Sequence, residues 1–540
     1  MTSTVTEAVE EMDAVIVGAG IAGLYMLHRL RAMGLKARVF EAGSGVGGTW
    51  YWNRYPGARV DIESQEYSYS FSEDLEREWK WTERYAAQPE ILRYLNHVAD
   101  RFDLRSGIQF ESRITSAVFD EEGCRWLVTS ERGDRVRAKF FIAATGCLSA
   151  PNAPAFPGQE NFNGATYHTS SWPPEGVDFE GQRVAVIGTG SSAIQSIPQI
   201  SSQASQVYVF QRTANYSVPA HNGPADRAIA DAWLANREEN RQLQKTSRGG
   251  FLHSNSGTQM ASQTGEEERR RIFEERWAQG GFSVGASFAD LAIDPASNAM
   301  AAAFAAEKIR EIVRDPKVAE RLTPKDYPFG AKRICVDTGY YQTFNQPNVQ
   351  LIDLRETPLE AISATGVTTS GGEFPVDAIV FAIGFDAMTG ALSRIDIRGR
   401  DGLPLKQAWA EGPKNYLGIM VAGFPNLFTI TGPGSPSVLS NMFVSIEQHV
   451  DWIADVIAYI GAVRMATIEA ARDAQNAWVD HVNGLANMTL YVQANSWYLG
   501  ANVPGKPRVF MPYMGGVGAY RDLCAAVAAN NYLGFKLRAA

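Results

Sequence analysis

The chain has 540 residues, 45% hydrophobic and 20% charged, with a net charge of −9. This length predicts two or three domains, and the acidic balance argues against nucleic acid and anionic membrane surfaces as partners. The four cysteines are far apart and form no CxxC. They argue for a reducing compartment and against a structural zinc or a redox dithiol. With neither a signal peptide nor an apolar run near ~18 residues, a cytoplasmic location is expected.

The N-terminal stretch predicts a dinucleotide-binding unit. A strand at 13–17 runs into GAGIAG, with glycines at Gly18, Gly20 and Gly23, followed by a helical stretch and a second strand that stops at Glu41. Glycines at this spacing let the backbone approach a pyrophosphate at the helix N-terminus, and the acid accepts hydrogen bonds from ribose hydroxyls. The unit therefore fits FAD or NAD.

Directly after this unit, residues 47–61 read GGTWYWNRYPGARVD. The segment combines glycines, bulky rings and opposite charges within fifteen residues, a mixture that neither a surface loop nor a core requires. We expect it to form part of a cofactor site.

A second dinucleotide unit follows the strand RVAVI at 183–187. Gly188 and Gly190 open its turn, and the next strand ends with Gln211 where the first unit has Glu41, followed by Arg212. A neutral residue and an arginine at this place remove repulsion for a 2′-phosphate and supply a bidentate partner, which favours NADPH. The alternative is that Arg212 is a plain surface charge.

These patterns predict an α/β protein with two Rossmann-like dinucleotide-binding domains. We expect an FAD-binding domain in two parts, 1–147 and 385–540, and an NADPH-binding domain at 148–384. Residues 224–325 are polar, rich in Ala, Glu and Arg, and helical in period, so they predict a helical insertion packed on the NADPH domain. Its charge run is expected to be a solvated face.

The segment FNGATYHTSSWP resembles a family signature, F-x-G-x-x-x-H-x-x-x-W-P, that is typical of the type I Baeyer–Villiger monooxygenases. Residues 47–61 match the family's second signature, and the resemblance extends over nearly the whole chain, nearest to the phenylacetone and steroid monooxygenase branch. The motif residues are Phe162, Gly164, His168, Trp172 and Pro173. The resemblance implies an FAD enzyme that uses NADPH and O₂, through a C4a-peroxyflavin, to convert a ketone into an ester or lactone.

The resemblance also implies a catalytic pair. YPFGAKRIC matches the family segment with the catalytic arginine, which is Arg333 here, and Asp61 matches the acid that pairs with it. Arginine suits this task because it stays charged and presents several donors to an anionic oxygen. Lys332 matches a position near the NADPH 2′-phosphate, together with Arg212 and Thr213.

Further residues are assigned from the same resemblance. His168 is expected to couple the domains rather than act as a general base, with Trp172 packed beside it. The FAD contacts are expected from Gly48, Thr49, Trp50, Tyr55, Asp61 and Met442. The NADPH contacts are expected from Ser191, Ser192, Gln195 and Trp497, besides the glycines and cations above. The substrate pocket is expected from Ile62, Leu148, Ser435, Leu439, Met442 and Trp497, with small serines in the 435–442 loop leaving room for a bulky ketone. No metal site is expected.

Three alternatives stay open at this stage. A flavin N- or S-oxygenase would share most of these motifs. A pyridine nucleotide–disulfide reductase would share the two nucleotide units but needs a CxxC that this chain lacks. A non-catalytic nucleotide-binding protein would keep the glycines without needing Arg333. The expected partners are a small ketone and O₂, with no obligate protein partner.

Overall fold

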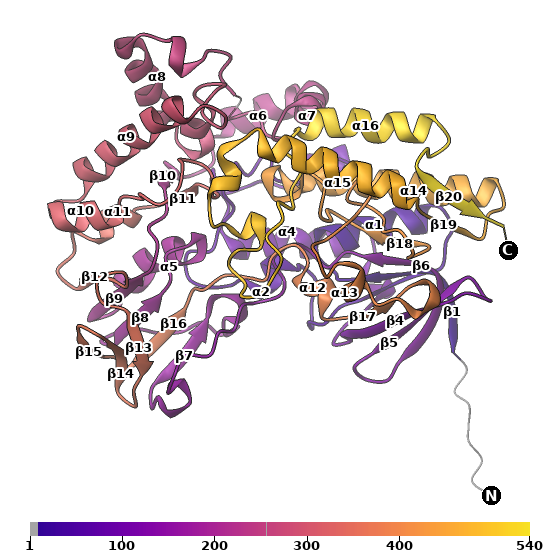
Figure 1. The fold of residues 1–540 in the computed structure, drawn as a ribbon, viewed down its shortest axis with the longest axis horizontal. Helices are drawn as coiled ribbons and strands as arrows, with labels where there is room; N and C mark the ends of the chain where they lie inside the picture. The colour runs from indigo at the N-terminus through magenta and orange to yellow at the C-terminus, as the bar shows by residue number, and fades with distance from the viewer. Residues whose placement is uncertain (1–8, 255, 540) are drawn as a thin grey trace, which may run out of the picture.

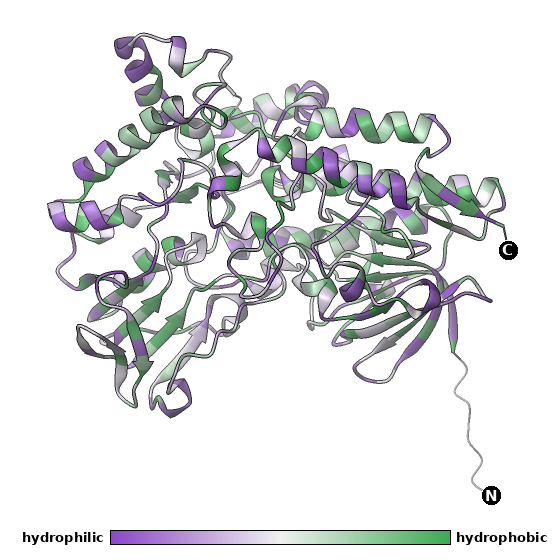
Figure 2. Cartoon of the chain, viewed as in Figure 1, coloured by the Kyte–Doolittle hydropathy of each residue, from purple (hydrophilic) through white to green (hydrophobic). Residues whose placement is uncertain are grey.

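Two sheets lie side by side in the computed structural model, which describes residues 9–254 and 256–539. In Figure 1 one sheet lies at the lower right and the other at the lower left, with helices across the top. Both sheets contain parallel strands whose apolar residues are buried, and Figure 2 shows their strands as predominantly hydrophobic. The fold is α/β with two Rossmann-like units, as the sequence predicts.

The first sheet holds the first glycine turn. Its eight strands run in the order β17-β4-β5-β6-β1-β2-β3, with β18 paired to β6. β17 and β18 come from beyond residue 384, so the chain returns to this sheet after leaving it. The strands are β1 (Glu10–Val17), β2 (Ala37–Phe40), β3 (Ile108–Gln109), β4 (Ile114–Asp120), β5 (Arg125–Ser130), β6 (Arg135–Ala143), β17 (Asp396–Arg398) and β18 (Leu427–Thr429).

Helices cover this sheet from both ends of the sequence. Helix α1 (Ile21–Ala32) packs against α14 (Met442–Ala462), the long helix that follows the 432–441 loop. Both are largely buried because their apolar residues join one core cluster. The neighbouring elements are α2 (Thr49–Trp52), α3 (Glu73–Glu78), α4 (Gln88–Arg101), α12 (Gly390–Ser393), α13 (Leu405–Ala408), α15 (Arg472–Asn487), α16 (Val517–Ala529) and the pair β19 (Thr467–Ala470) and β20 (Phe535–Arg538).

The second sheet holds the second glycine turn. Its five strands run in the order β12-β9-β8-β16-β7, and every pair is parallel. The strands are β7 (Ala165–His168), β8 (Arg183–Ile187), β9 (Gln206–Gln211), β12 (Val349–Asp353) and β16 (Ala378–Phe381), and α5 (Ser191–Ser201) follows the turn. Nearby lie β10 (Ser217–Pro219), β11 (Cys335–Asp337), α11 (Tyr340–Thr343), β13 (Leu359–Ile362), β14 (Gly366–Thr369) and β15 (Gly372–Pro375).

The insertion between β10 and β11 is helical, as predicted. Its α-helices are α6 (Arg227–Ala235), α7 (Arg237–Thr246), α8 (Glu266–Gln279), α9 (Pro295–Ile312) and α10 (Pro316–Leu322). The charges of α8 form a solvated face: Arg270 and Arg271 are each within 3.3 Å of glutamates on the same helix, and the helix is largely hydrophilic in Figure 2.

The insertion also contacts the first unit, which the sequence does not indicate. Arg241 and Arg237 lie 2.7 and 2.8 Å from the carboxylate of Glu76, on α3 of the first unit. Arg241 and Glu76 are both 4% exposed, so a buried ion pair joins the insertion to the first unit. Composition and helical period carry no information about such a partner.

Within residues 9–254 and 256–539, none of the helices combines the length and apolar composition that a membrane crossing requires. The same residues contain no cluster of His, Cys, Asp or Glu side chains arranged to hold a metal ion.

Candidate active site

The first glycine turn has the geometry of a nucleotide cradle. Gly18 has φ +104°, and a Cβ on it would lie 2.7 Å from the carbonyl oxygen of Ala144. A Cβ on Gly23 would lie 1.8 Å from the Gly18 oxygen, so only glycine lets α1 pack on the turn. Gly20 approaches Gly48, where a Cβ would lie 3.3 Å from the Gly48 Cα. The two segments predicted to contact FAD therefore meet through their glycines.

Glu41 stands at the end of β2 with its carboxylate fixed. Its Oε2 accepts from the Ala19 amide and its Oε1 from the Gly43 amide, both at 2.7 Å. Each oxygen keeps a further lone pair, which is what a ribose hydroxyl needs. The residues present therefore fit the ribose and pyrophosphate of FAD.

Residues 47–61 form the wall that faces this cradle. Gly48 has φ +53° and precedes α2, which begins at the exposed Thr49. Trp50 is 7% exposed, and its indole Nε1 donates to the Tyr67 hydroxyl at 3.2 Å. Tyr55 is partly buried against the core of the second unit, and its hydroxyl donates to Gln195 at 2.9 Å. Its expected FAD contact stays a prediction.

Asp61 and Arg333 form the ion pair that the resemblance implies, although 272 positions separate them. Arg333 Nε donates to Asp61 Oδ2 at 2.7 Å, and Nη2 donates to Oδ1 at 2.8 Å. The third nitrogen, Nη1, donates to the carbonyl oxygen of Val438 at 2.6 Å, and the guanidinium carbon lies 5.0 Å from the Phe282 ring centre. A bidentate pair with a third anchor fixes the guanidinium plane.

Arg333 stays protonated and positively charged in this position. Burial lowers its pKa, but the Asp61 carboxylate and the Tyr498 hydroxyl raise it well above its ordinary value. Burial also raises the pKa of the Cys335 thiol to about 12, so this neighbour stays neutral. Three of the guanidinium's five N–H groups donate to Asp61 and Val438. The remaining two can serve Tyr498 and an anionic oxygen in the site.

The second glycine turn fits a nucleotide differently. A Cβ on Gly188 would lie 2.3 Å from the Ala382 oxygen, so this glycine packs on β16. A Cβ on Gly190 would meet nothing within 4 Å, so the turn is open where a pyrophosphate would lie against the start of α5. Ser191 begins that helix exposed, and Ser192 accepts a hydrogen bond from Thr169 at 3.3 Å.

Two cations converge beside this turn. Arg212 is exposed at the end of β9, and Lys332 lies 4.3 Å from the Tyr327 ring centre. Burial lowers the pKa of Lys332, and the positive charge of Arg212 lowers it further, so the two charges act on one another. Thr213 adds only a backbone contact, since its carbonyl oxygen accepts from Thr189 at 2.7 Å. A pair of like charges held together is a site for an anion such as a 2′-phosphate.

The histidine motif belongs to the edge of the second sheet. His168 ends β7, opposite Phe381 of β16, and the two rings stack with centres 5.5 Å apart. Trp172 is 5% exposed in the core of this unit, and a Cβ on Gly164 would lie 2.5 Å from the Phe162 ring. Burial lowers the pKa of His168. These contacts lie within the second unit, so the coupling role stays a prediction, and none of them involves Arg333.

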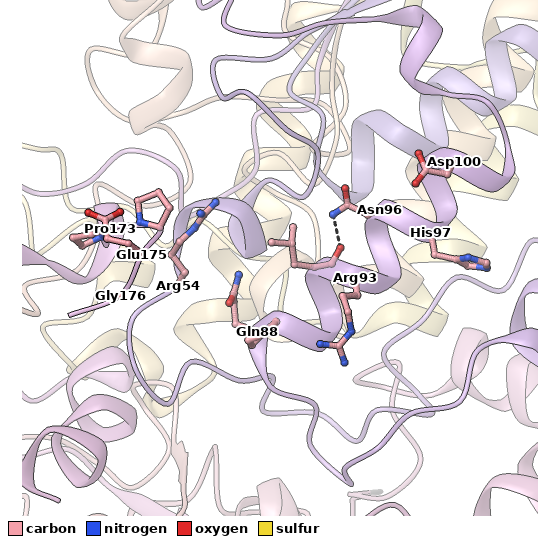
Figure 3. Close-up of a pocket in the computed structure, with 12 residues that line it drawn as sticks. Arg54, Gln88, Arg93, Asn96, His97, Asp100, Pro173, Glu175 and Gly176 are labelled. Carbon is pink, nitrogen blue, oxygen red and sulfur yellow. Dashed lines mark hydrogen bonds between the residues drawn. The ribbon is translucent and has the colours of Figure 1, made fainter. Parts of the chain in front are cut away.

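A cleft of about 780 Å³ opens where the two motifs meet (Figure 3). One wall is α4 with Arg54, and the other is the turn Pro173–Gly176 that completes the histidine motif. In this view Arg54 lies between Pro173 and Gln88. Neither Arg333 nor Asp61 lines the cleft, so the cleft lies at the seam between the units and apart from this ion pair.

An apolar cluster borders Arg333 on the side of the 435–442 loop. It includes Val438, whose carbonyl holds Arg333, and Tyr498. Four predicted pocket residues are partly buried against it: Leu148, Leu439, Met442 and Trp497. Ile62 is 5% exposed and belongs to the core of the first unit.

The predicted role of the loop serines is wrong. Ser435 is 0% exposed, and its hydroxyl donates to the Gly432 oxygen at 2.7 Å. Ser437 and Ser440 are also buried, with hydroxyl contacts to Cys147 and Ser445. These small polar residues stabilise the inside of the loop, because buried hydroxyls need partners, and they do not line a cavity.

Three contacts of Arg333 are absent from the sequence interpretation. Phe282 comes from the insertion, Val438 contributes only a carbonyl group, and Tyr498 is the neighbour of the predicted Trp497. Only Tyr498 carries a sequence signal, as part of the aromatic ANSWYLG stretch.

Comparison with known proteins supports a monooxygenase. The family profile described as pyridine nucleotide-disulphide oxidoreductase matches residues 15–232, the stretch with both glycine turns. Acetone monooxygenase (methyl acetate-forming) from Gordonia sp. is 43% identical over 97% of this chain and 99% of its own. A Baeyer-Villiger monooxygenase from Pseudooceanicola batsensis is 42% identical over 97% and 95%. Phenazine N-monooxygenase PhzNO1 from Lysobacter antibioticus is 42% identical over 97% of both.

Solved structures agree. An oxidized steroid monooxygenase bound to NADP has a TM-score of 0.94 and 55% identity over 98% of this chain and 100% of its own. A structure of OTEMO complexed with FAD and NADP has a TM-score of 0.95 and 40% identity over 98% and 100%. The four cysteines are free and far apart, so nothing here resembles the dithiol of a disulfide reductase.

Proposed function

The chain belongs to the flavin-dependent Baeyer–Villiger monooxygenases, and we propose that Arg333, held by Asp61, is the cation of its oxygenation site. It is an NADPH-dependent enzyme with FAD, whose substrates are a ketone and O₂. The observation that carries the role of Arg333 is its bidentate pair with Asp61 beside the apolar cluster of Val438 and Tyr498.

The proposed mechanism assigns each residue one task. FAD, when bound and reduced by NADPH, supplies with O₂ the oxygen atom that is inserted next to the carbonyl. Arg333 donates the N–H group that Asp61, Val438 and Tyr498 leave free to the negative charge that develops on oxygen in the site. Asp61 and the Val438 carbonyl hold the guanidinium plane, so no reorientation is needed at the moment of reaction. The apolar cluster keeps water away and strengthens these interactions.

The same proposal places NADPH at the second glycine turn. Gly190 leaves room for the pyrophosphate, and Arg212 with Lys332 binds the 2′-phosphate. His168 and Trp172 are proposed to couple this unit to the first, because Pro173, the residue after Trp172, lines the cleft between the two units. The boundaries 1–147, 148–384 and 385–540 are proposed domain limits, because β16 ends one unit and β17 returns to the other. We also propose a cytoplasmic location.

The ketone that we propose is apolar. Leu148, Leu439, Met442 and Trp497 all join one hydrophobic cluster, and the serines of the loop face inward. A panel of cyclic, aryl and steroidal ketones, analysed by gas chromatography for esters and lactones, tests this. The proposal requires a yellow, FAD-containing preparation whose NADPH consumption rises when a ketone is added. Equal product from a charged keto acid would contradict the apolar assignment.

A second candidate function is N-oxygenation. The phenazine N-monooxygenase relative favours it, since its identity to this chain is close to that of the ketone monooxygenases. Incubating the same preparation with phenazine and with a cyclic ketone gives the ratio of the two rates. A rate of N-oxide formation from phenazine that exceeds the rate of lactone formation from the cyclic ketone would make N-oxygenation the main activity.

A further inference from the structure

The side chain of Gln195 bridges the two nucleotide units. It lies in the first turn and a half of α5, directly after the second glycine turn, and is 8% exposed. Its Oε1 accepts from the Tyr55 hydroxyl at 2.9 Å, and its Nε2 donates to the Arg59 carbonyl oxygen at 3.1 Å. Both partners belong to the 47–61 segment of the first unit, so one amide group is hydrogen-bonded to both ends of the short turn from Tyr55 to Arg59.

This turn leads directly to Asp61. The Ala58 amide donates to the Tyr55 oxygen at 3.1 Å, and a Cβ on Gly57 would lie 2.2 Å from the Gln195 carbonyl oxygen. The turn therefore lies flat against α5, and only glycine permits that approach. On the other side, Arg59 Nη1 donates to Glu83 at 2.8 Å. The segment is held between Glu83 of the first unit and Gln195 of the second.

Tyr55 also lies close to the catalytic pair. Burial raises its pKa, and the next cause is the charge of Asp61, followed by Cys335. A shift of the Tyr55–Arg59 turn would move Asp61 with it, because one residue separates them along the chain. Asp61 orients Arg333 through two hydrogen bonds, so the shift would reach the guanidinium.

We propose that Gln195 is a positioning residue for oxygenation: it fixes the Tyr55–Arg59 turn, and through it Asp61 and Arg333, from the helix that follows the NADPH turn. The proposal assigns the Gln195 amide to these two protein contacts instead of the NADPH contact that the sequence analysis expects. The proposal rests on the proposed role of Arg333.

The test uses the holoenzyme and three variants: Gln195→Met, Tyr55→Phe and the double variant. Gln195→Met keeps the length of the side chain and removes both hydrogen bonds, while Tyr55→Phe removes one. Gln199→Met is the matched control, because Gln199 lies one turn later on α5 and is exposed, and its Cγ would lie 3.0 Å from a Cβ on Gly57. The readouts are anaerobic flavin reduction by NADPH, the Kd of NADP⁺, and ester formed per NADPH oxidised. FAD content and the melting temperature report folding.

We expect Gln195→Met to lower ester formed per NADPH about five- to tenfold, which corresponds to two hydrogen bonds at the weak end of their usual range, with flavin reduction and the Kd within about twofold of wild type. Tyr55→Phe is expected to show the same pattern, less strongly, and the double variant to be no worse than Gln195→Met. Gln199→Met is expected to match wild type. If Gln195→Met does not fold, Tyr55→Phe tests the proposal by itself, and unchanged ester formed per NADPH in that variant would overturn it.

Two results would overturn the proposal. A higher Kd of NADP⁺ with unchanged ester per NADPH would make Gln195 a nucleotide ligand. Additive losses in the double variant would show that Gln195 and Tyr55 act separately. An Arg333→Ala enzyme with full ester formation would instead refute the role of Arg333, whatever the Gln195 variants show, so the two failures are distinguishable.

Discussion

Replacing Asp61 with asparagine tests how much the orientation of Arg333 contributes. The change keeps the shape of the side chain but removes the charge and exchanges one acceptor oxygen for an N–H₂ donor. One of the two hydrogen bonds to Arg333, 2.7 or 2.8 Å long, is lost, and a donor then faces a donor. The contact from Arg333 Nη1 to the Val438 carbonyl remains.

The expected cost follows from these contacts. Losing one charge-assisted hydrogen bond weakens the hold on the guanidinium by about 1.5–3 kcal/mol. A displacement of about 1 Å in a reacting group lowers a rate about 10²-fold. We therefore expect ester formation by Asp61→Asn to fall about 10- to 100-fold. Flavin reduction by NADPH should change much less, since the cations of the second turn are untouched.

The assay measures ester by gas chromatography and NADPH oxidation by absorbance in the same reaction, with peroxide release as a check on uncoupling. Glu63→Gln is the matched control, because Glu63 lies two residues away and pairs with Arg84 at 2.6 Å at similar burial. The control should keep ester formation near wild type. Ester formation within twofold of wild type for Asp61→Asn, or an equal loss in both variants, would refute the reasoning.

Three further outcomes are expected. Arg212→Ala and Lys332→Ala should each raise the KM for NADPH about tenfold and leave NADH unaffected, because each removes a charged partner of the 2′-phosphate; an equal effect on both nucleotides in steady-state assays would contradict this. Gly190→Ala should fold normally and bind NADP⁺ at least about tenfold more weakly by titration, whereas Gly188→Ala should lose stability, since its φ is +116° and its Cβ would clash. Burial lowers the pKa of His449 to about 3 in the folded state, whereas an unfolded histidine has a pKa of about 6.5. The unfolded chain therefore binds a proton first as the pH falls, and the free energy of unfolding drops by up to about 1.4 kcal/mol per pH unit between about 6.5 and 3. Denaturant unfolding between pH 7 and 5 should show a shallower loss for His449→Gln, and identical slopes would exclude this histidine as the cause.

The local patterns of the sequence predicted most of the fold. Strand, glycine turn, helix and strand follow one another within about thirty residues, so Gly18 to Glu41 and Gly188 to Arg212 can be interpreted without knowledge of the rest of the chain. The predicted strand at 183–187 is β8 with the same bounds. The open space at Gly190 and the packed surface at Gly188 cannot be told apart in the sequence, because they depend on whether a distant segment lies beside each glycine: Ala382, directly after β16, packs on Gly188, and nothing lies within 4 Å of a Cβ on Gly190.

The long-range parts of the site were only partly predictable. The pairing of Asp61 with Arg333 follows from the family resemblance and not from spacing, since 272 positions separate them. The Val438 carbonyl has no side-chain signature, and Phe282 reaches Arg333 from an insertion whose composition indicates a solvated helix bundle. The prediction that the serines of the 435–442 loop leave room for a ketone was wrong, because a small side chain leaves space only where the surrounding backbone is open. There the backbone closes on them.

The most direct test of the central claim is Arg333→Ala, with flavin reduction and ester formation measured separately. Stopped-flow mixing with NADPH under anaerobic conditions follows the loss of flavin absorbance, and gas chromatography after aerobic turnover measures ester. Arg333 donates to the oxygen charge in the site, so we predict that the variant is still reduced by NADPH and forms no detectable ester. Ester formation at the wild-type rate would contradict the account.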